Sequence, residues 1–189
     1  MNKTMMATAM AAAVLATAPA NAVTVTSVRI DTLITDYLQV AELQLFANGV
    51  NVALGKVATA SSTGFVFGGD PVPSKAVDGS TNGNYPNIFH SGVQDGSDFL
   101  TVDLGGAFDV TSIAIFGRTD ACCTFRDLYG FTLFNGATVV RTGTLDARDT
   151  SFAAAAVPEP AAWSLMIAGV GLVGGAMRRR TVRTAVSFG

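Results

Sequence analysis

The chain has 189 residues, of which 49% are hydrophobic and 14% are charged, and its formal net charge is −2. Between residues 23 and 157, seven Lys and Arg stand against thirteen Asp and Glu, so this part of the chain has a net charge of −6. An acidic body argues against nucleic acid as a partner, because nucleic-acid binding depends on Lys and Arg that neutralise phosphates. The length fits one domain with its own hydrophobic core.

The first 22 residues have the pattern of a secretory signal peptide. Lys3 precedes a short apolar stretch, and Ala20-Asn21-Ala22 forms an A-x-A cleavage site. A buried Ala-rich helix is the alternative. Export would place the rest of the chain in a compartment where a Cys–Cys bond persists.

Short runs of alternating apolar and polar residues dominate the chain after residue 22, and helical periodicity is scarce. Clusters of Gly, Asn, Asp and Pro separate the runs, as in proteins with many short strands. The pattern predicts an all-β fold, a jelly-roll β-sandwich, over residues 23–152. Residues 63–98 have little strand signal and are expected to form long functional loops. The expected strands are 23–30, 37–47, 99–105, 110–117, 131–136 and 138–145.

The C-terminal part has a different composition. Residues 153–160 are expected to be a linker that contains Pro158-Glu159-Pro160. Residues 161–177 carry no charge, and their number is at the short limit for a membrane-spanning helix. The arginines that follow place a basic tail, residues 178–189, on the cytoplasmic side. We expect a single transmembrane helix over residues 161–177.

The order of Val157-Pro158-Glu159-Pro160, an apolar span and arginines strongly resembles the PEP-CTERM sorting signal of Gram-negative bacteria. The resemblance implies that an exosortase cuts the chain near Pro-Glu-Pro and that the product is released or joined to the envelope. It predicts an exported protein with an inner-membrane-anchored precursor, whose mature form lies at the cell surface or outside the cell.

Four stretches of the central region carry a second resemblance: NVALGKVATASS, SKAVDGSTNGNYPNIFHSG, FLTVDLGG and GRTDACCTFRDLYGFTLFN. Together they resemble F-type lectins (fucolectins), members of the discoidin, or coagulation factor five/eight type C, group of galactose-binding-like jelly rolls. The resemblance covers roughly residues 24–150. DYLQVAELQLF looks like the last strands of that family, yet it precedes NVALGK. The chain therefore looks circularly permuted, a change that a sandwich with neighbouring termini tolerates.

The lectin resemblance implies a sugar site with one His, an Arg-x-Asp element, two adjacent cysteines and a second basic residue. Guanidinium groups offer forked donors to neighbouring hydroxyls, and a vicinal disulfide would form a weakly polar wall. Ala121 is inserted relative to the family pattern, and the segment before the histidine is shorter. The matching residues are His90, Arg118, Asp120, Cys122, Cys123 and Arg126.

Each of these residues also has an ordinary structural explanation. His90 would be a loop histidine bonded to the backbone, and the two arginines would form a surface pair bridging to Asp120 and Asp127. The cysteines would be reduced thiols at a strand end, which export disfavours.

The same resemblance implies a structural Ca²⁺ site. The family uses an Asp-Gly loop and a Glu at the start of its last strand, which match Asp78 and Glu42. Calcium takes about six to eight oxygen ligands and accepts backbone carbonyls. A turn residue and an exposed strand position are the alternatives for the two carboxylates. The candidate ligands are Glu42 and Asp78, carbonyls of Ala41, Lys75 and Ser80, and Asn87.

Catalysis is not expected. His90 is the single histidine of the chain, and the sequence has no zinc-type cluster and no distinctive carboxylate pair. We expect an exported, non-catalytic module that binds a glycan or exopolysaccharide through a fucose-like sugar. A structural protein of an exopolysaccharide or biofilm matrix, with this fold but no working sugar site, is the alternative. The other expected partners are an exosortase-type enzyme and, transiently, the inner membrane.

Overall fold

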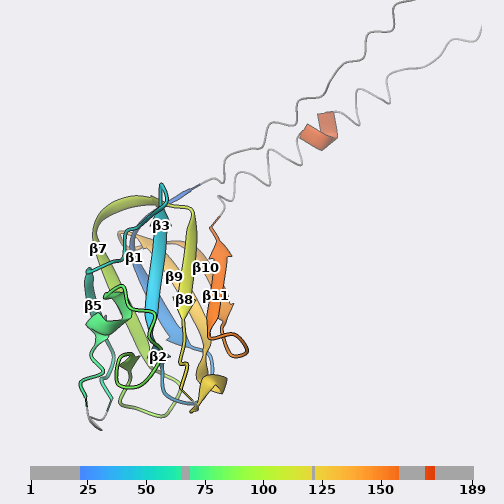
Figure 1. Cartoon of the computed structure of the whole chain (residues 1–189). Helices are drawn as coiled ribbons and strands as arrows, with labels where there is room; N and C mark the ends of the chain where they lie inside the picture. The colour runs from blue at the N-terminus through green and yellow to red at the C-terminus, as the bar shows by residue number, and fades with distance from the viewer. Residues whose placement is uncertain (1–21, 65–68, 121, 158–168, 173–189) are drawn as a thin grey trace, which may run out of the picture.

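The computed structural model describes residues 22–64, 69–120, 122–157 and 169–172. The prediction of an all-β protein is confirmed (Figure 1). Two 3₁₀ helices, η1 (Pro73–Val77) and η2 (Thr124–Arg126), interrupt the strands. The strands are β1 Val23–Thr32, β2 Gln39–Val40, β3 Glu42–Ala47, β4 Val50–Asn51, β5 Val57–Ala60, β6 Phe89–His90, β7 Phe99–Val110, β8 Ser112–Phe116, β9 Leu128–Asn135, β10 Thr138–Asp146 and β11 Phe152–Ala156.

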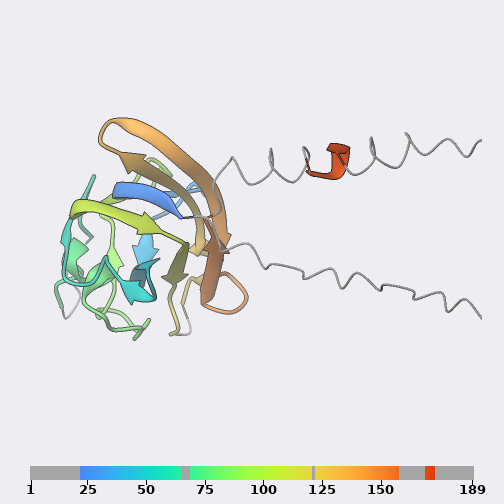
Figure 2. The ribbon, with the colours of Figure 1, turned by 90° about the horizontal axis from the view of Figure 1, so that it is seen from above.

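Two antiparallel sheets form the body of the protein. One has the strand order β10-β9-β1-β7-β5 and the other β11-β8-β3-β4. The view in Figure 2 shows β1 beside β7 in one layer, with the strands of the other sheet across from them. A separate pair, β2 with β6, lies among the loops. This arrangement is compatible with a β-sandwich, and the jelly-roll topology stays a prediction.

The core lies between the two sheets and draws on both. Fully buried side chains include Val28 on β1, Leu133 on β9, Leu43 on β3 and Ile115 on β8, and they belong to one hydrophobic cluster. Along β1 and β9, buried residues alternate with more exposed ones, because successive side chains of a strand point to opposite faces. The alternating runs in the sequence reflect this packing.

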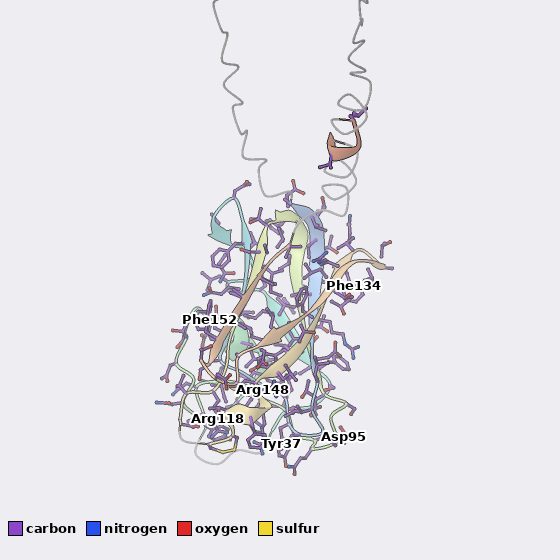
Figure 3. All side chains as sticks on the ribbon, turned by 90° about the vertical axis from the view of Figure 1, so that its right-hand side faces the viewer. Tyr37, Asp95, Arg118, Phe134, Arg148 and Phe152 are labelled. Atoms are coloured by element: carbon purple, nitrogen blue, oxygen red, sulfur yellow. A yellow bond between two sulfur atoms is a disulfide. The ribbon has the colours of Figure 1, made fainter. Side chains whose placement is uncertain are left out.

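The ladder registers separate the two ends of the molecule. At one end Val23 pairs with Val110 and Ala156 pairs with Ser112, so β1 begins and β11 ends side by side (Figure 1). At the opposite end Phe116 pairs with Glu42 and with Phe152. Tyr37 and Arg118 lie beyond this second end (Figure 3).

The expected linker that starts at residue 153 needs correction. Residues Phe152–Ala156 form β11, which pairs with β8 from Phe116 to Ser112. Alanine has little strand signal, but its backbone N–H and C=O groups pair as well as those of any residue. Val157 is also fully buried, and its N–H donates to the carbonyl of Thr111. The folded domain therefore extends to residue 157.

The other elements expected from the sequence lie largely outside the described part of the chain. The signal peptide, residues 1–22, is described only at residue 22, and the expected transmembrane helix, 161–177, only at residues 169–172, which are helical. The basic tail, 178–189, is not described. Among the described residues, no helix is both long and apolar enough to cross a membrane.

Replacing Leu43 by Ala tests the shared core. Leu43 is fully buried on β3, so the change should lower the free energy of unfolding by about 2–5 kcal/mol through lost burial and a cavity. Leu54, which is 53% exposed, provides the control, and Leu54→Ala should change stability by less than about 0.5 kcal/mol. Urea unfolding of wild type and both variants measures the free energies of unfolding. Equal losses of stability in the two variants would contradict the burial of Leu43 in the core.

Candidate functional site

Three of the predicted sugar-site residues meet at the end of the molecule opposite the start of β1. His90 ends β6, Arg118 lies two residues after β8, and Arg126 ends η2. Each arginine lies against a tyrosine ring, Arg118 against Tyr85 and Arg126 against Tyr37, and both of these rings lie beside His90. Two aromatic rings complete the group, since the ring centre of His90 is 4.9 Å from that of Tyr37 and 5.9 Å from that of Tyr85.

Arg118 is held in place by a carboxylate and an aromatic ring. Its Nη2 donates to Oδ2 of Asp120 at 2.9 Å, and its Nε donates to Oδ1 of the same group. The guanidinium lies 5.5 Å from the ring centre of Tyr85, whose backbone N–H also donates to Asp120. Burial raises the pKa of Asp120, but the hydrogen bonds from Arg118 and Tyr85 outweigh burial and hold this pKa below its usual value.

Arg126 has a similar environment with different partners. Its Nε lies 3.0 Å from Oδ1 of Asp36, and its guanidinium lies 5.1 Å from the ring centre of Tyr37. The ion pair with Asp127 that the sequence suggested is wrong. Asp127 faces the interior and is fully buried, whereas Arg126 points to the loop before β2. The two arginines thus each have one Asp and one Tyr partner.

His90 is neutral at neutral pH. Burial lowers its pKa most, and the charges of Arg126 and Arg118 lower it further, while a hydrogen bond to Ser91 opposes them. Nδ1 lies 2.7 Å from the carbonyl oxygen of Ser91, which can only accept, so Nδ1 carries the proton. Nε2 is therefore the acceptor nitrogen of the ring. His90 makes the backbone bond that the sequence suggested as an alternative, and this bond also sets its tautomer.

Cys122 and Cys123 are joined by a vicinal disulfide, so they are not the reduced thiols of the alternative explanation. Cys123 has a left-handed backbone conformation, with φ of 69°, and directly precedes η2. Its carbonyl accepts hydrogen bonds from Arg126 N–H and from Nε2 of Gln39. These bonds fix the position of the cysteine pair relative to Arg126 and Gln39.

Sequence reasoning missed the buried network around Asp127. Oδ1 accepts from Nε2 of Gln39 at 2.8 Å and from the Tyr129 hydroxyl at 2.9 Å, and Oδ2 accepts from the backbone N–H of Arg118 at 2.8 Å. A Cβ at Gly117 would overlap this carboxylate, so only glycine fits there. Burial raises the pKa of Asp127, and these three donors oppose the increase.

Asp36, Tyr37 and Tyr85 were also missed. Tyr37 and Asp36 lie in the loop between β1 and β2, far in sequence from Arg126, so no local motif connects them. Tyr85 stood within the stretch NYPN of the lectin-like pattern, and an aromatic residue beside the single histidine was the one available signal.

The structure brings together the two candidate calcium carboxylates. Glu42 begins β3 and is fully buried, which rules out the exposed strand position of the alternative explanation. Its Oε2 accepts from the N–H of Gly79 at 3.1 Å, while Oε1 is buried and has no hydrogen-bond partner among the residues that the structure describes. Burial raises the pKa of Glu42 to about 7, and the charge of Asp78 contributes. A buried carboxylate oxygen without a donor fits a bound cation.

The other expected calcium ligands are less closely grouped. Ala41 precedes Glu42, and Lys75 lies on η1, which ends at the Asp78 loop. Ser80 N–H donates to Oδ1 of Asp78 at 2.8 Å, as in the turn suggested as an alternative. Asn87 donates its backbone N–H to the carbonyl of Asn84, and no contact within the described part of the chain places it at Glu42 or Asp78. Among the described residues, no cluster of three or more His, Cys, Asp or Glu side chains forms a metal centre, so a cation here would depend on backbone carbonyls.

These features define an all-β protein with a polar, aromatic-lined group at one end. The PEP-CTERM protein-sorting motif matches residues 156–180, which indicates an exported protein recognised by an exosortase-type processing enzyme. The match begins on Ala156, the last residue of β11, so the sorting motif overlaps the last two residues of the folded domain. No curated protein and no solved structure matches the chain.

The raised pKa of Glu42 predicts a pH-dependent stability in the absence of divalent cations. The pKa is about 7 in the folded chain against an ordinary 4.5, so the folded state holds this proton more tightly than the unfolded state. Stability should therefore fall as pH rises from 4.5 to 7, by up to roughly 3 kcal/mol from this group. Glu42→Gln cannot ionise and should lack that loss.

Urea unfolding of both proteins in chelator, at several pH values across this window, measures the difference. Other titrating groups are common to the two proteins and cancel in the comparison. A constant difference between wild type and Glu42→Gln across the window would show that Glu42 keeps an ordinary pKa.

Proposed function

We propose that the protein is an exported, non-catalytic carbohydrate-binding protein that takes a neutral, fucose-like sugar at the end of the sandwich formed by His90, Arg118, Arg126 and the vicinal disulfide. The fold would be the galactose-binding-like jelly roll, circularly permuted. The observation that carries the proposal is the arrangement of the two arginines. Each guanidinium is paired with one carboxylate and lies near one tyrosine ring, and both tyrosine rings lie beside a neutral histidine.

This arrangement suits hydroxyl recognition. Arg118 and Arg126 have N–H donors in a fixed plane, and His90 offers Nε2 as an acceptor, so neighbouring hydroxyls find both kinds of partner. Asp120 and Asp36 balance the two positive charges. A charge-balanced group favours a neutral sugar over a carboxylated one, because both arginines of the site are already paired with a carboxylate.

The accessibility of the arginines favours a second candidate function. The side chains of Arg118 and Arg126 are only 11% and 12% exposed, and both are already ion-paired. A structural protein of an exopolysaccharide or biofilm matrix, with the arginines as loop supports, would have the same contacts. The two functions differ in whether the isolated protein binds a small glycan.

Glycan titration separates these candidates. For the exported protein, Arg118→Ala and Arg126→Ala should each weaken binding of a fucosylated oligosaccharide at least about tenfold, because each removes charge-assisted hydrogen bonds worth about 1.5–3 kcal/mol. His90→Ala should cost less, because it removes a neutral acceptor. Isothermal titration calorimetry gives the dissociation constants.

Arg29→Ala is the matched control. Arg29 also pairs with an Asp two residues on, and its guanidinium lies 3.8 Å from the ring centre of Phe99, but it lies on β1 outside the candidate site. Its removal should leave binding unchanged. If wild type binds neither fucosylated nor galactosylated glycans, or if all three arginine variants bind alike, the matrix function replaces the sugar-binding one.

We also propose that Ca²⁺ supports the loop that follows η1, with Glu42 and Asp78 as its side-chain ligands. Bound there, the cation would supply positive charge to the buried Oε1 of Glu42. Calcium at a hundredfold excess over its dissociation constant should raise stability by about 2.7 kcal/mol. Thermal unfolding with and without chelator measures the effect, and both Glu42→Gln and Asp78→Ala should abolish it.

Asp95→Ala provides a matched control for this experiment. Asp95 accepts from the N–H of Ser97 at 2.8 Å, in the same turn that Asp78 makes with Ser80, and it lies in a different loop. This variant should keep the full response to Ca²⁺. Melting curves of wild type that do not change with chelator would remove calcium from the proposal.

A further inference from the structure

A hollow lies beside η2. Its volume is about 430 Å³, and its walls come from η2 and from the loop between β10 and β11. The residues that line it are Thr124, Phe125, Arg148 and Asp149. The ring of Phe125 is 58% exposed, so it is available for contact with a ligand in the hollow.

The hollow lies next to Arg126 of the proposed sugar site. The guanidinium of Arg126 lies 5.4 Å from the ring centre of Phe125 and 5.1 Å from that of Tyr37. Arg126 therefore lies near the tyrosine of the histidine group, and the preceding residue of the same 3₁₀ turn, Phe125, lines the hollow. A ligand held at Arg126 has its next unit beside Phe125.

Hydrogen bonds fix the two walls of the hollow to each other and to the segment that carries Arg118. The N–H of Ala147 donates to the carbonyl of Asp127 at 2.8 Å, which ties the β10–β11 loop to the end of η2. Ser151 donates from Oγ to the carbonyl of Arg118 at 2.7 Å and from N–H to the carbonyl of Ala147. The hollow is thus pre-formed, which lowers the entropic cost of binding.

The lining has the chemistry of a sugar subsite. The exposed ring of Phe125 offers a flat apolar surface for the C–H face of a pyranose ring. The guanidinium of Arg148, held by two hydrogen bonds to Asp146, keeps further N–H donors, and the carboxylate of Asp149 and the hydroxyl of Thr124 supply acceptors. Two carboxylates against one guanidinium disfavour an acidic sugar. A neutral hexose fits these groups best.

We propose that this hollow is a second subsite that takes the neutral hexose next to the sugar held at Arg118 and Arg126, so that the ligand is an oligosaccharide or the end of a polysaccharide. The inference rests on the proposed function and specifies its substrate class. Phe125 packs against the second ring, and Arg148 binds its hydroxyls.

The test compares one sugar with a chain that ends in it. L-fucose and 2′-fucosyllactose are titrated into the full protein in calcium, by calorimetry, for wild type, Phe125→Ala, Arg148→Ala and Arg126→Ala. Wild type should bind the trisaccharide at least about fivefold more tightly than fucose, the effect of one added aromatic contact. Phe125→Ala and Arg148→Ala should remove that advantage and change fucose affinity less than about twofold.

Arg126→Ala should weaken binding of both ligands. Val139→Ala, which truncates another exposed apolar side chain, should change neither affinity. If wild type binds fucose and the trisaccharide equally, or if Phe125→Ala leaves the ratio intact, the subsite is overturned while the primary site stands. If wild type binds neither ligand, the proposed function and the subsite fall together.

Discussion

The candidate site depends on one buried carboxylate. Asp127 accepts hydrogen bonds from Gln39 on β2, from Tyr129 on β9 and from the backbone of Arg118 after β8. A buried carboxylate that loses its donors is costly, so all three segments are held at fixed positions. Gln39 in turn donates to the carbonyl of Cys123, which brings the disulfide into the same network. The positions of the arginine, the cysteine pair and η2 all follow from this group.

Most of the strands could be predicted from the alternation of apolar and polar residues alone. Strands such as β1 and β9 bury one face, and the alternating pattern is visible in their residues. The pattern fails where a strand lies at an edge or has small side chains. In β11 the run from Ala153 to Ala156 has no alternation to read, and the backbone pairing with β8 decides its structure. The two-residue β6 is too short to give any periodic signal.

The site was predictable where its contacts are local in sequence. Arg118 and Asp120 are two residues apart, so their ion pair follows from the spacing. Arg126 has its own partner, Asp36, ninety positions away, and only the fold brings them together. The neighbouring Asp127 was the natural guess, but burial turns it inward. The burial of Glu42 also depends on a contact that is distant in sequence. The loop after η1 packs on it, and Gly79 in that loop donates a hydrogen bond to its carboxylate.

The opposite placement of the chain ends and the candidate site has a mechanical consequence. β1 begins and β11 ends at one end of the two-sheet body, and Arg118 lies at the other (Figures 1 and 3). A protein held by the chain beyond Val157 and pulled through a ligand at the far end is loaded along its strands. The ladder between β11 and β8, five residue pairs long, is then strained in shear, so its hydrogen bonds share the load and do not open one at a time. Such a domain resists extension along the axis on which a tether and a bound polymer would pull.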